Sequence, residues 1–117
     1  MDSSLLDEAN EDAWTTAVDL DPAVASGSDD VSIEVVLGER ILAIFRHARV
    51  WYAIDGMCSH QGGPLAQGTV AHGCVTCPWH GWQYELETGI QTINRQPLQS
   101  TFPIRQIGTR VEVLLTQ

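Results

Sequence analysis

Two short stretches of the sequence, CSHQGGPL at residues 58–65 and CPWHGW at residues 77–82, determine how the whole 117-residue chain is interpreted. Each stretch contains one cysteine and one histidine, separated by one residue in the first stretch and by two in the second. Spacing this short allows both side chains of a stretch to extend from a single tight loop. Thiolate and imidazole groups are ligands for transition metals. The sequence therefore marks four candidate metal ligands: Cys58, His60, Cys77 and His80.

The segments on either side of these stretches have the composition and periodicity of short β-strands. Residues 31–35 and 82–86 alternate apolar and polar side chains, which is the period of a half-buried strand. Residues 21–30 contain Pro, Gly, Ser and Asp and are expected to form a loop. Further runs of apolar, aromatic and β-branched residues predict strands at residues 14–18, 41–45, 50–54, 102–107 and 110–114. Short strands joined by frequent turns predict an all-β fold, an antiparallel sandwich or barrel.

The length of the chain is that of one domain, which we expect to cover residues 13–117. A small subdomain rich in Gly, Cys and His is expected to be inserted at about residues 55–93. Residues 1–12 are expected to form an acidic N-terminal tail, with one helical turn at residues 5–12.

The negative charge of the chain is concentrated near its start. Nine acidic residues and no Lys or Arg fall within the first thirty positions, whereas six acids balance six arginines from Val31 onward. An acidic excess disfavours binding to nucleic acid and to anionic lipid. A solvated tail is the simpler interpretation of the acidic segment, and steering of a basic protein partner is the alternative.

The longest apolar run, residues 41–45, is far shorter than the roughly 20 residues that a membrane-spanning helix needs. The first residues lack the basic and apolar regions of a secretory signal, so we expect a soluble, cytoplasmic protein. Cysteines of such a protein stay reduced. Metal binding or simple burial is therefore expected for Cys58, Cys74 and Cys77, and not a disulfide framework.

The two stretches at 58–65 and 77–82 resemble the cluster-binding loops of the Rieske family, and most of all those of the small Rieske-type ferredoxins of ring-hydroxylating dioxygenase systems. The resemblance covers roughly residues 13–115. It implies a Rieske-type β domain with one [2Fe–2S] cluster, in which two cysteines hold one iron and two histidines hold the other. Carried over to this chain, the cysteine ligands are Cys58 and Cys77 and the histidine ligands are His60 and His80.

The chain departs from the high-potential Rieske proteins of respiratory complexes at three positions. Gly63 and Trp79 stand where those proteins have two disulfide-bonded cysteines, and Trp82 stands where they have a serine that donates to a cluster sulfide. Tyr84 matches the family's tyrosine and is expected to keep one hydrogen bond. Because fewer donors stabilise the reduced cluster less, we predict a reduction potential of about −150 mV, at the low end of the range for such clusters.

Cys74 leaves a competing metal site open. With Cys77, Cys58 and either histidine it makes a possible Cys3His zinc set. Zinc leaves one histidine and the segment 62–64 unexplained, whereas the cluster uses both stretches and leaves only Cys74 over. A thioredoxin-like dithiol lacks the surrounding βαβ pattern. His47 and His72 are expected to be exposed turn residues and not ligands.

The expected role is electron transfer and not catalysis by this chain alone. An oxygenase also needs a second iron, held by two histidines and a carboxylate, and no histidine follows His80. No GxGxxG segment for a dinucleotide is present. The resemblance implies a one-electron carrier between a flavin-dependent reductase and a Rieske-type oxygenase, within a multicomponent oxidoreductase. The alternatives are a small Rieske subunit of a larger reductase, such as nitrite reductase, and a zinc-stabilised interaction module.

Overall fold

The structure is a computed structural model, and it describes residues 13–59, 62–79 and 81–115. The helical turn expected at residues 5–12 lies outside the described residues. The strands are β1 (Trp14–Asp19), β2 (Val31–Leu37), β3 (Arg40–His47), β4 (Val50–Asp55), β5 (Thr69–Ala71), β6 (Cys74–Thr76), β7 (Gln83–Glu85), β8 (Thr101–Phe102), β9 (Ile104–Ile107) and β10 (Arg110–Leu114). The helical elements are α2 (Pro22–Ser26) and the 3-10 turn η2 (Leu65–Gln67).

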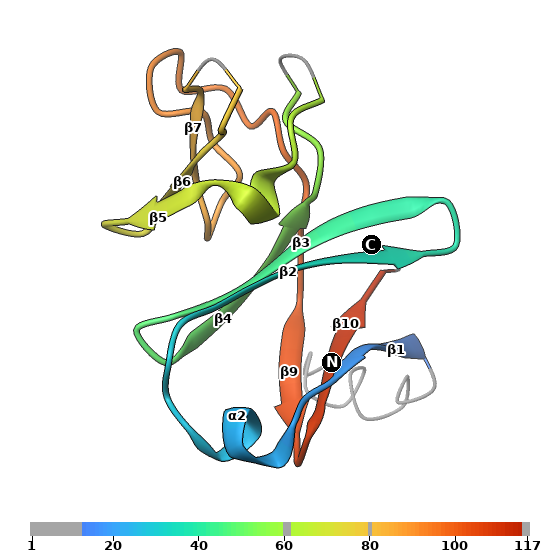
Figure 1. Cartoon of the computed structure of the whole chain (residues 1–117). Helices are drawn as coiled ribbons and strands as arrows, with labels where there is room; N and C mark the ends of the chain where they lie inside the picture. Colours follow the sequence, from blue (N-terminus) through green and yellow to red (C-terminus); the bar gives the residue numbers. More distant parts are fainter. Residues whose placement is uncertain (1–12, 60–61, 80, 116–117) are drawn as a thin grey trace, which may run out of the picture.

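The strands form three sheets with the orders β2-β3-β4-β8, β1-β10-β9 and β5-β6-β7, and every strand pair is antiparallel. The prediction of an all-β antiparallel fold is confirmed. The sheet β5-β6-β7 stands apart at one end of the molecule, beyond the end of β4, while the sheet β1-β10-β9 and α2 lie at the other end (Figure 1). In the part of the chain that the structure describes, no helix is long and apolar enough to cross a membrane.

Strand β3 separates two hydrophobic cores, and this explains why residues 41–45 show no alternation. Leu42 and Ile44 pack in the core shared with the sheet β1-β10-β9. Ala43 and Phe45 point to the other face of β3 and pack in the core shared with the sheet β5-β6-β7. A strand covered on both faces is apolar at every position. Burial of a large side chain such as Phe45 contributes about 1.5–3 kcal/mol.

The core that contains Ala43 and Phe45, called the second core below, connects the candidate site to the rest of the protein. It lies between the sheet β2-β3-β4-β8, the main sheet, and the sheet β5-β6-β7, the small sheet. On the side of the main sheet it contains Phe45 and Ile54. On the side of the small sheet it contains Leu65, Val75, Tyr84, Leu86, Cys58 and Cys77. The two candidate cysteine ligands are therefore part of a packed core and are held against the main sheet.

The loop expected at residues 21–30 contains a short helix. Pro22 occupies the first helical position, and the side chain of Asp21 accepts a hydrogen bond from the backbone N–H of Ala23 at 2.9 Å. Proline at the start of a helix after a capping aspartate is a known helix-start signal, which the abundance of loop-forming residues obscured. The structure also has strands β5 and β6 within the insertion, for which the sequence predicts no regular element.

Candidate metal centre

Two backbone loops carry the candidate ligands, and each loop is closed by hydrogen bonds at its base. In the first loop, which follows β4, the N–H of Cys58 donates to the carbonyl of Gly63 at 2.8 Å, and the N–H of Gly62 donates to the carbonyl of Cys58 at 2.7 Å. In the second loop, between β6 and β7, the N–H of Cys77 donates to the carbonyl of Trp82 at 2.7 Å. Each cysteine thus stands at the closed base of its loop.

The structure brings Cys58 and Cys77 together as free thiols, with exposed fractions of 3% and 1%. Burial raises the pKa of the Cys77 thiol, the backbone N–H of Trp79 lowers it, and a hydrogen bond with the Cys58 thiol raises it further. Two of the four candidate ligands, His60 and His80, lie outside the described residues. The described half of the candidate set is therefore a pair of adjacent buried thiols, the type of donor that binds iron or zinc.

The two loops touch where Trp79 and Gly63 meet. A Cβ atom added to Gly63 would lie 2.6 Å from the sulfur of Cys77 and 2.9 Å from Cγ of Trp79. Only glycine allows this approach. Gly63 and Trp79 are the positions matched above to the disulfide of high-potential Rieske proteins, and here an indole packed on a glycine backbone joins the loops at that place.

Tyr84 provides the hydrogen bond that the sequence predicted. Its hydroxyl lies 3.0 Å from the sulfur of Cys58 and 2.9 Å from the hydroxyl of Ser59, and its side chain is fully buried. Burial, and after it the hydrogen bond with Cys58, raises the pKa of Tyr84 to about 12. The phenol is therefore protonated at neutral pH, and its hydroxyl can donate a hydrogen bond to a sulfur. The backbone N–H of Trp79 donates to the sulfur of Cys77 at 3.4 Å.

Gln99 supports the first loop, although no motif or spacing in the sequence marks it as a site residue. Its side-chain nitrogen donates to the carbonyls of Asp55 at 3.2 Å and Met57 at 2.9 Å. Its side-chain oxygen accepts the backbone N–H of Ser59 at 2.8 Å. Gln99 has an exposed fraction of only 3%, so these three bonds are shielded from water. A single side chain thus fixes the backbone on both sides of Cys58.

Cys74 lies apart from this pair of thiols. On β6 it is directly opposite Glu85 of β7, while its neighbour Val75 is opposite Tyr84. Because successive side chains of a strand point to opposite faces, Cys74 points away from the face that carries Val75 and Tyr84. Burial, and after it the Glu85 carboxylate, raises the pKa of Cys74. Within the described residues, no three side chains of His, Cys, Asp or Glu gather where they could hold a metal ion.

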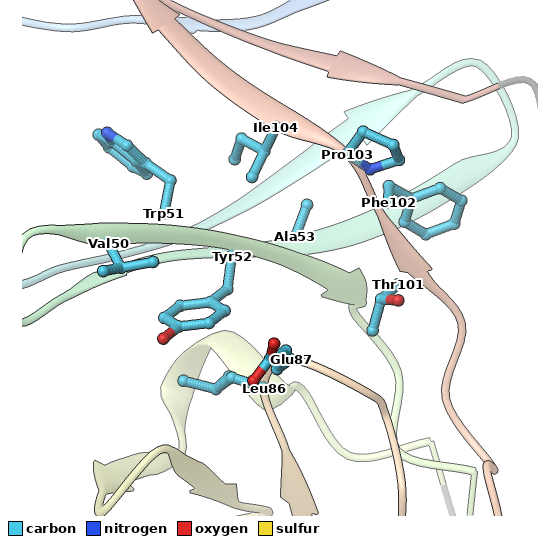
Figure 2. Close-up of a pocket in the computed structure, with 10 residues that line it drawn as sticks. All are labelled: Val50, Trp51, Tyr52, Ala53, Leu86, Glu87, Thr101, Phe102, Pro103 and Ile104. Atoms are coloured by element: carbon cyan, nitrogen blue, oxygen red, sulfur yellow. The ribbon is translucent and has the colours of Figure 1, made fainter. Parts of the chain in front are cut away.

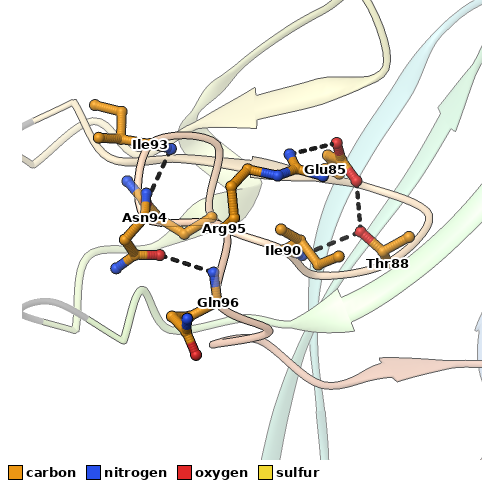
Figure 3. A network of polar contacts seen from close by, with 8 residues as sticks. Glu85, Thr88, Ile90, Ile93, Asn94, Arg95 and Gln96 are labelled. Carbon is orange, nitrogen blue, oxygen red and sulfur yellow. Dashed lines mark hydrogen bonds and ion pairs between the residues drawn. The ribbon is translucent and has the colours of Figure 1, made fainter.

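A network of polar contacts shapes the segment that follows β7 (Figure 3). Glu85 accepts a hydrogen bond from the hydroxyl of Thr88 at 2.7 Å and forms an ion pair with Arg95 at 3.0 Å. These two contacts lower the pKa of Glu85. The side chain of Gln91 accepts the backbone N–H groups of Ile93 and Asn94. The network folds residues 85–96 back on the small sheet.

The two remaining histidines are placed away from the thiol pair. The prediction of an exposed turn residue is wrong for His47, which is the last residue of β3 and is half-buried. Its Nδ1 atom lies 3.1 Å from the carboxylate of Asp30. His72 is exposed in the turn between β5 and β6, with a φ of 54°.

An open groove of about 560 Å³ lies where the small sheet meets the main sheet. Figure 2 shows Tyr52 of β4 pointing toward Leu86 and Glu87, with Ile104 on the other side of the strand. The described lining contains one carboxylate, that of Glu87, and is otherwise mostly apolar. Besides this carboxylate, the polar side-chain groups of the lining are the hydroxyls of Tyr52 and Thr101 and the indole N–H of Trp51.

Comparisons with known proteins agree with this geometry. The profile of the Rieske [2Fe–2S] domain matches residues 19–103. The anthranilate 1,2-dioxygenase ferredoxin subunit of Burkholderia cepacia is 31% identical over 93 residues, which cover 78% of this chain and 85% of the relative. The ferredoxin component of the alkene monooxygenase system of Xanthobacter autotrophicus is 37% identical over 78 residues, or 64% of this chain and 62% of that protein.

The fold is also similar to solved structures. The ferredoxin of Sphingomonas yanoikuyae B1 superimposes with a TM-score of 0.72 at 21% identity, over 87% of this chain and 98% of that one. The residues present fit the cofactor of the matching family, because two adjacent buried thiols lie beside a protonated phenol at the contact of two closed loops. This chain belongs to the Rieske [2Fe–2S] domain family and carries one [2Fe–2S] cluster.

Proposed function

We propose that this chain is a one-electron carrier that takes electrons from a flavin-dependent reductase and passes them to a Rieske-type oxygenase. In this proposal Cys58 and Cys77 hold one iron of the cluster, and His60 and His80 hold the other. The observation that carries the proposal is the pair of adjacent buried thiols at the bases of two touching loops. When bound, the cluster accepts and returns a single electron.

The chain's own residues bind the cluster and adjust the charge around it. The buried thiols keep the sulfur end within the second core, where water is excluded. The Tyr84 hydroxyl and the Trp79 N–H donate to the two ligand sulfurs and stabilise the negative charge that an added electron brings. Donors to sulfur are among the features that set the potential of such clusters.

Two exposed apolar side chains flank the loops and support transient contact with protein partners. Trp79 and Met57 are 50% and 51% exposed. A contiguous exposed apolar patch marks an interaction site, and these two side chains lie against adjacent residues, Met57 against Gly62 and Trp79 against Gly63. Trp79 is also in contact with the loop of Cys58 through Gly63, which gives a short path from the surface to the thiols.

The nature of the partners is supported by the relatives. Two of them are named as ferredoxin components, one of a dioxygenase and one of a monooxygenase system. A carrier of this kind has no active site of its own. We also propose a cytoplasmic location, since Cys74, the cysteine outside the proposed ligand set, is a free thiol and suits a reducing compartment.

The proposal is tested with the purified chain, a flavin reductase and a Rieske oxygenase in one assay. Oxygenase turnover is expected to depend on the concentration of the added chain, and Cys77→Ala is expected to abolish this dependence. Cys74→Ser is the matched control and is expected to support turnover as the native chain does. Tight co-purification with a large reductase, without transfer to any oxygenase, would instead identify a fixed subunit.

A further inference from the structure

The hydroxyl of Tyr84 lies between two groups of adjacent residues, the sulfur of Cys58 at 3.0 Å and the hydroxyl of Ser59 at 2.9 Å. Ser59 is an exposed residue and not a candidate ligand, yet its hydroxyl contacts a fully buried phenol. Its backbone is also held, because its N–H donates to the side-chain oxygen of Gln99 at 2.8 Å. The hydroxyl of Ser59 is therefore kept in a defined place.

The number of protons fixes the direction of the hydrogen bonds once a metal is bound. A cysteine sulfur that ligates iron has lost its proton and can only accept. Tyr84 has one hydroxyl proton, which it must then donate to Cys58. Since that proton is used, the contact between Tyr84 and Ser59 requires the serine hydroxyl to donate to the phenol oxygen. The result is a one-way chain from Ser59 to Tyr84 to Cys58.

The side chain of Gln99 holds the backbone of Ser59 at the outer end of this chain of hydrogen bonds. Its nitrogen donates to two carbonyls, those of Asp55 and Met57, so its oxygen faces the N–H of Ser59. An amide turned the other way would place nitrogen against an N–H donor and oxygen against two carbonyls. The position of Ser59 therefore follows from three hydrogen bonds of one buried side chain.

We propose that Ser59 is a positioning residue that raises the reduction potential of the cluster by orienting and polarising the hydroxyl of Tyr84. A donor to the phenol oxygen makes the phenol a stronger donor, by roughly 10–30% for each added bond of a chain. A stronger hydrogen bond to the ligand sulfur stabilises the more negative, reduced state. The inference rests on the proposed function, because it requires that Cys58 is a ligand.

The test is a redox titration of four variants, each with its [2Fe–2S] cluster assembled. Tyr84→Phe removes the donor and is expected to lower the midpoint potential. Ser59→Ala is expected to lower it by roughly 10–30% of that shift. Ser59→Thr, which keeps the hydroxyl, is expected to restore the native value. In the double variant Ser59→Ala/Tyr84→Phe the potential is expected to equal that of Tyr84→Phe alone.

The matched control is Ser26→Ala in α2, where an exposed serine hydroxyl contacts the carbonyl of Ala23 far along the chain from the loops. This variant is expected to keep the native potential. A potential of Ser59→Ala that is unchanged or raised, or a shift of equal size with and without Tyr84, overturns the inference.

Visible absorbance and EPR of each variant separate this failure from that of the proposed function. If Ser59→Ala carries a native cluster signal with the native potential, only the role of Ser59 is wrong. If Cys58→Ala retains the native cluster signal, the ligand set is wrong, and the inference fails with it.

Discussion

Replacing Gln99 by leucine tests how much a single buried side chain contributes to the first loop. The substitution keeps the approximate volume but removes two hydrogen bonds to the carbonyls of Asp55 and Met57 and one from the N–H of Ser59. A typical intramolecular hydrogen bond contributes about 1 kcal/mol net, so the loss is about 3 kcal/mol. That is a large share of the 5–15 kcal/mol by which domains are usually stable.

The consequence is expected first in the loop that carries Cys58. If the lost 3 kcal/mol lowers the free energy of local opening of this loop, the fraction of molecules with an open loop rises roughly a hundredfold. The conversion is about 1.4 kcal/mol for each factor of ten in an equilibrium constant. Cluster loss to an iron chelator, followed by visible absorbance, is expected to accelerate to a similar degree. Urea unfolding, followed by circular dichroism, measures the global part of the effect.

Gln96→Leu is the matched control, because Gln96 is an exposed glutamine three residues earlier in the chain. It is expected to bleach and unfold as the native protein does. Bleaching of Gln99→Leu at a rate within twofold of the native rate, with unchanged unfolding, would refute the reasoning that this side chain holds the loop.

Three further predictions address the loop contact, the third cysteine and the pH dependence. Gly63→Ala places a Cβ atom 2.6 Å from the sulfur of Cys77 and is expected to reduce the iron content per chain. Gly38→Ala, which is strained by a φ of 65° but meets no atom within 4 Å, is expected to lower stability and to keep the iron content full. Cys74→Ser is expected to retain the visible spectrum and Cys77→Ala to lose it, and the reverse result would point to a different ligand set. The pKa of Glu85 is lowered by Thr88 and Arg95 from its ordinary value of 4.5, so its contribution to stability is present above that value and is lost as the pH falls through the lowered pKa. The difference in thermal unfolding between native protein and Glu85→Gln is therefore expected to shrink in acid, and a difference that grows there would contradict the assignment.

Periodicity and composition were sufficient to predict the all-β architecture. The two faces of β2 and β7 differ in burial, and their sequences alternate accordingly. Strand β3 was predicted from its β-branched and aromatic content, although both of its faces are buried. Strands β5 and β6 were missed because each has only three residues and, unlike β7, neither is flanked by residues that continue an alternation.

The candidate site was predicted only in its local part. Spacing within each stretch placed Cys58 and Cys77 in tight loops, and the structure brings these two thiols together. The support from Gln99 gives no local signal, because that residue lies 40 positions beyond Ser59 in the chain and acts through backbone groups. Contacts of this kind depend on how the chain returns past the loop, which composition does not encode.

Pulsed EPR of the dithionite-reduced protein, prepared with nitrogen-labelled histidine, tests the central claim most directly. The account predicts the signal of a reduced [2Fe–2S] cluster with hyperfine couplings to the nitrogens of two histidine ligands. The couplings of one histidine are expected to disappear in any cluster that His80→Ala still assembles. A [2Fe–2S] signal without histidine nitrogen coupling, or a colourless protein that holds zinc and no iron, would contradict the account.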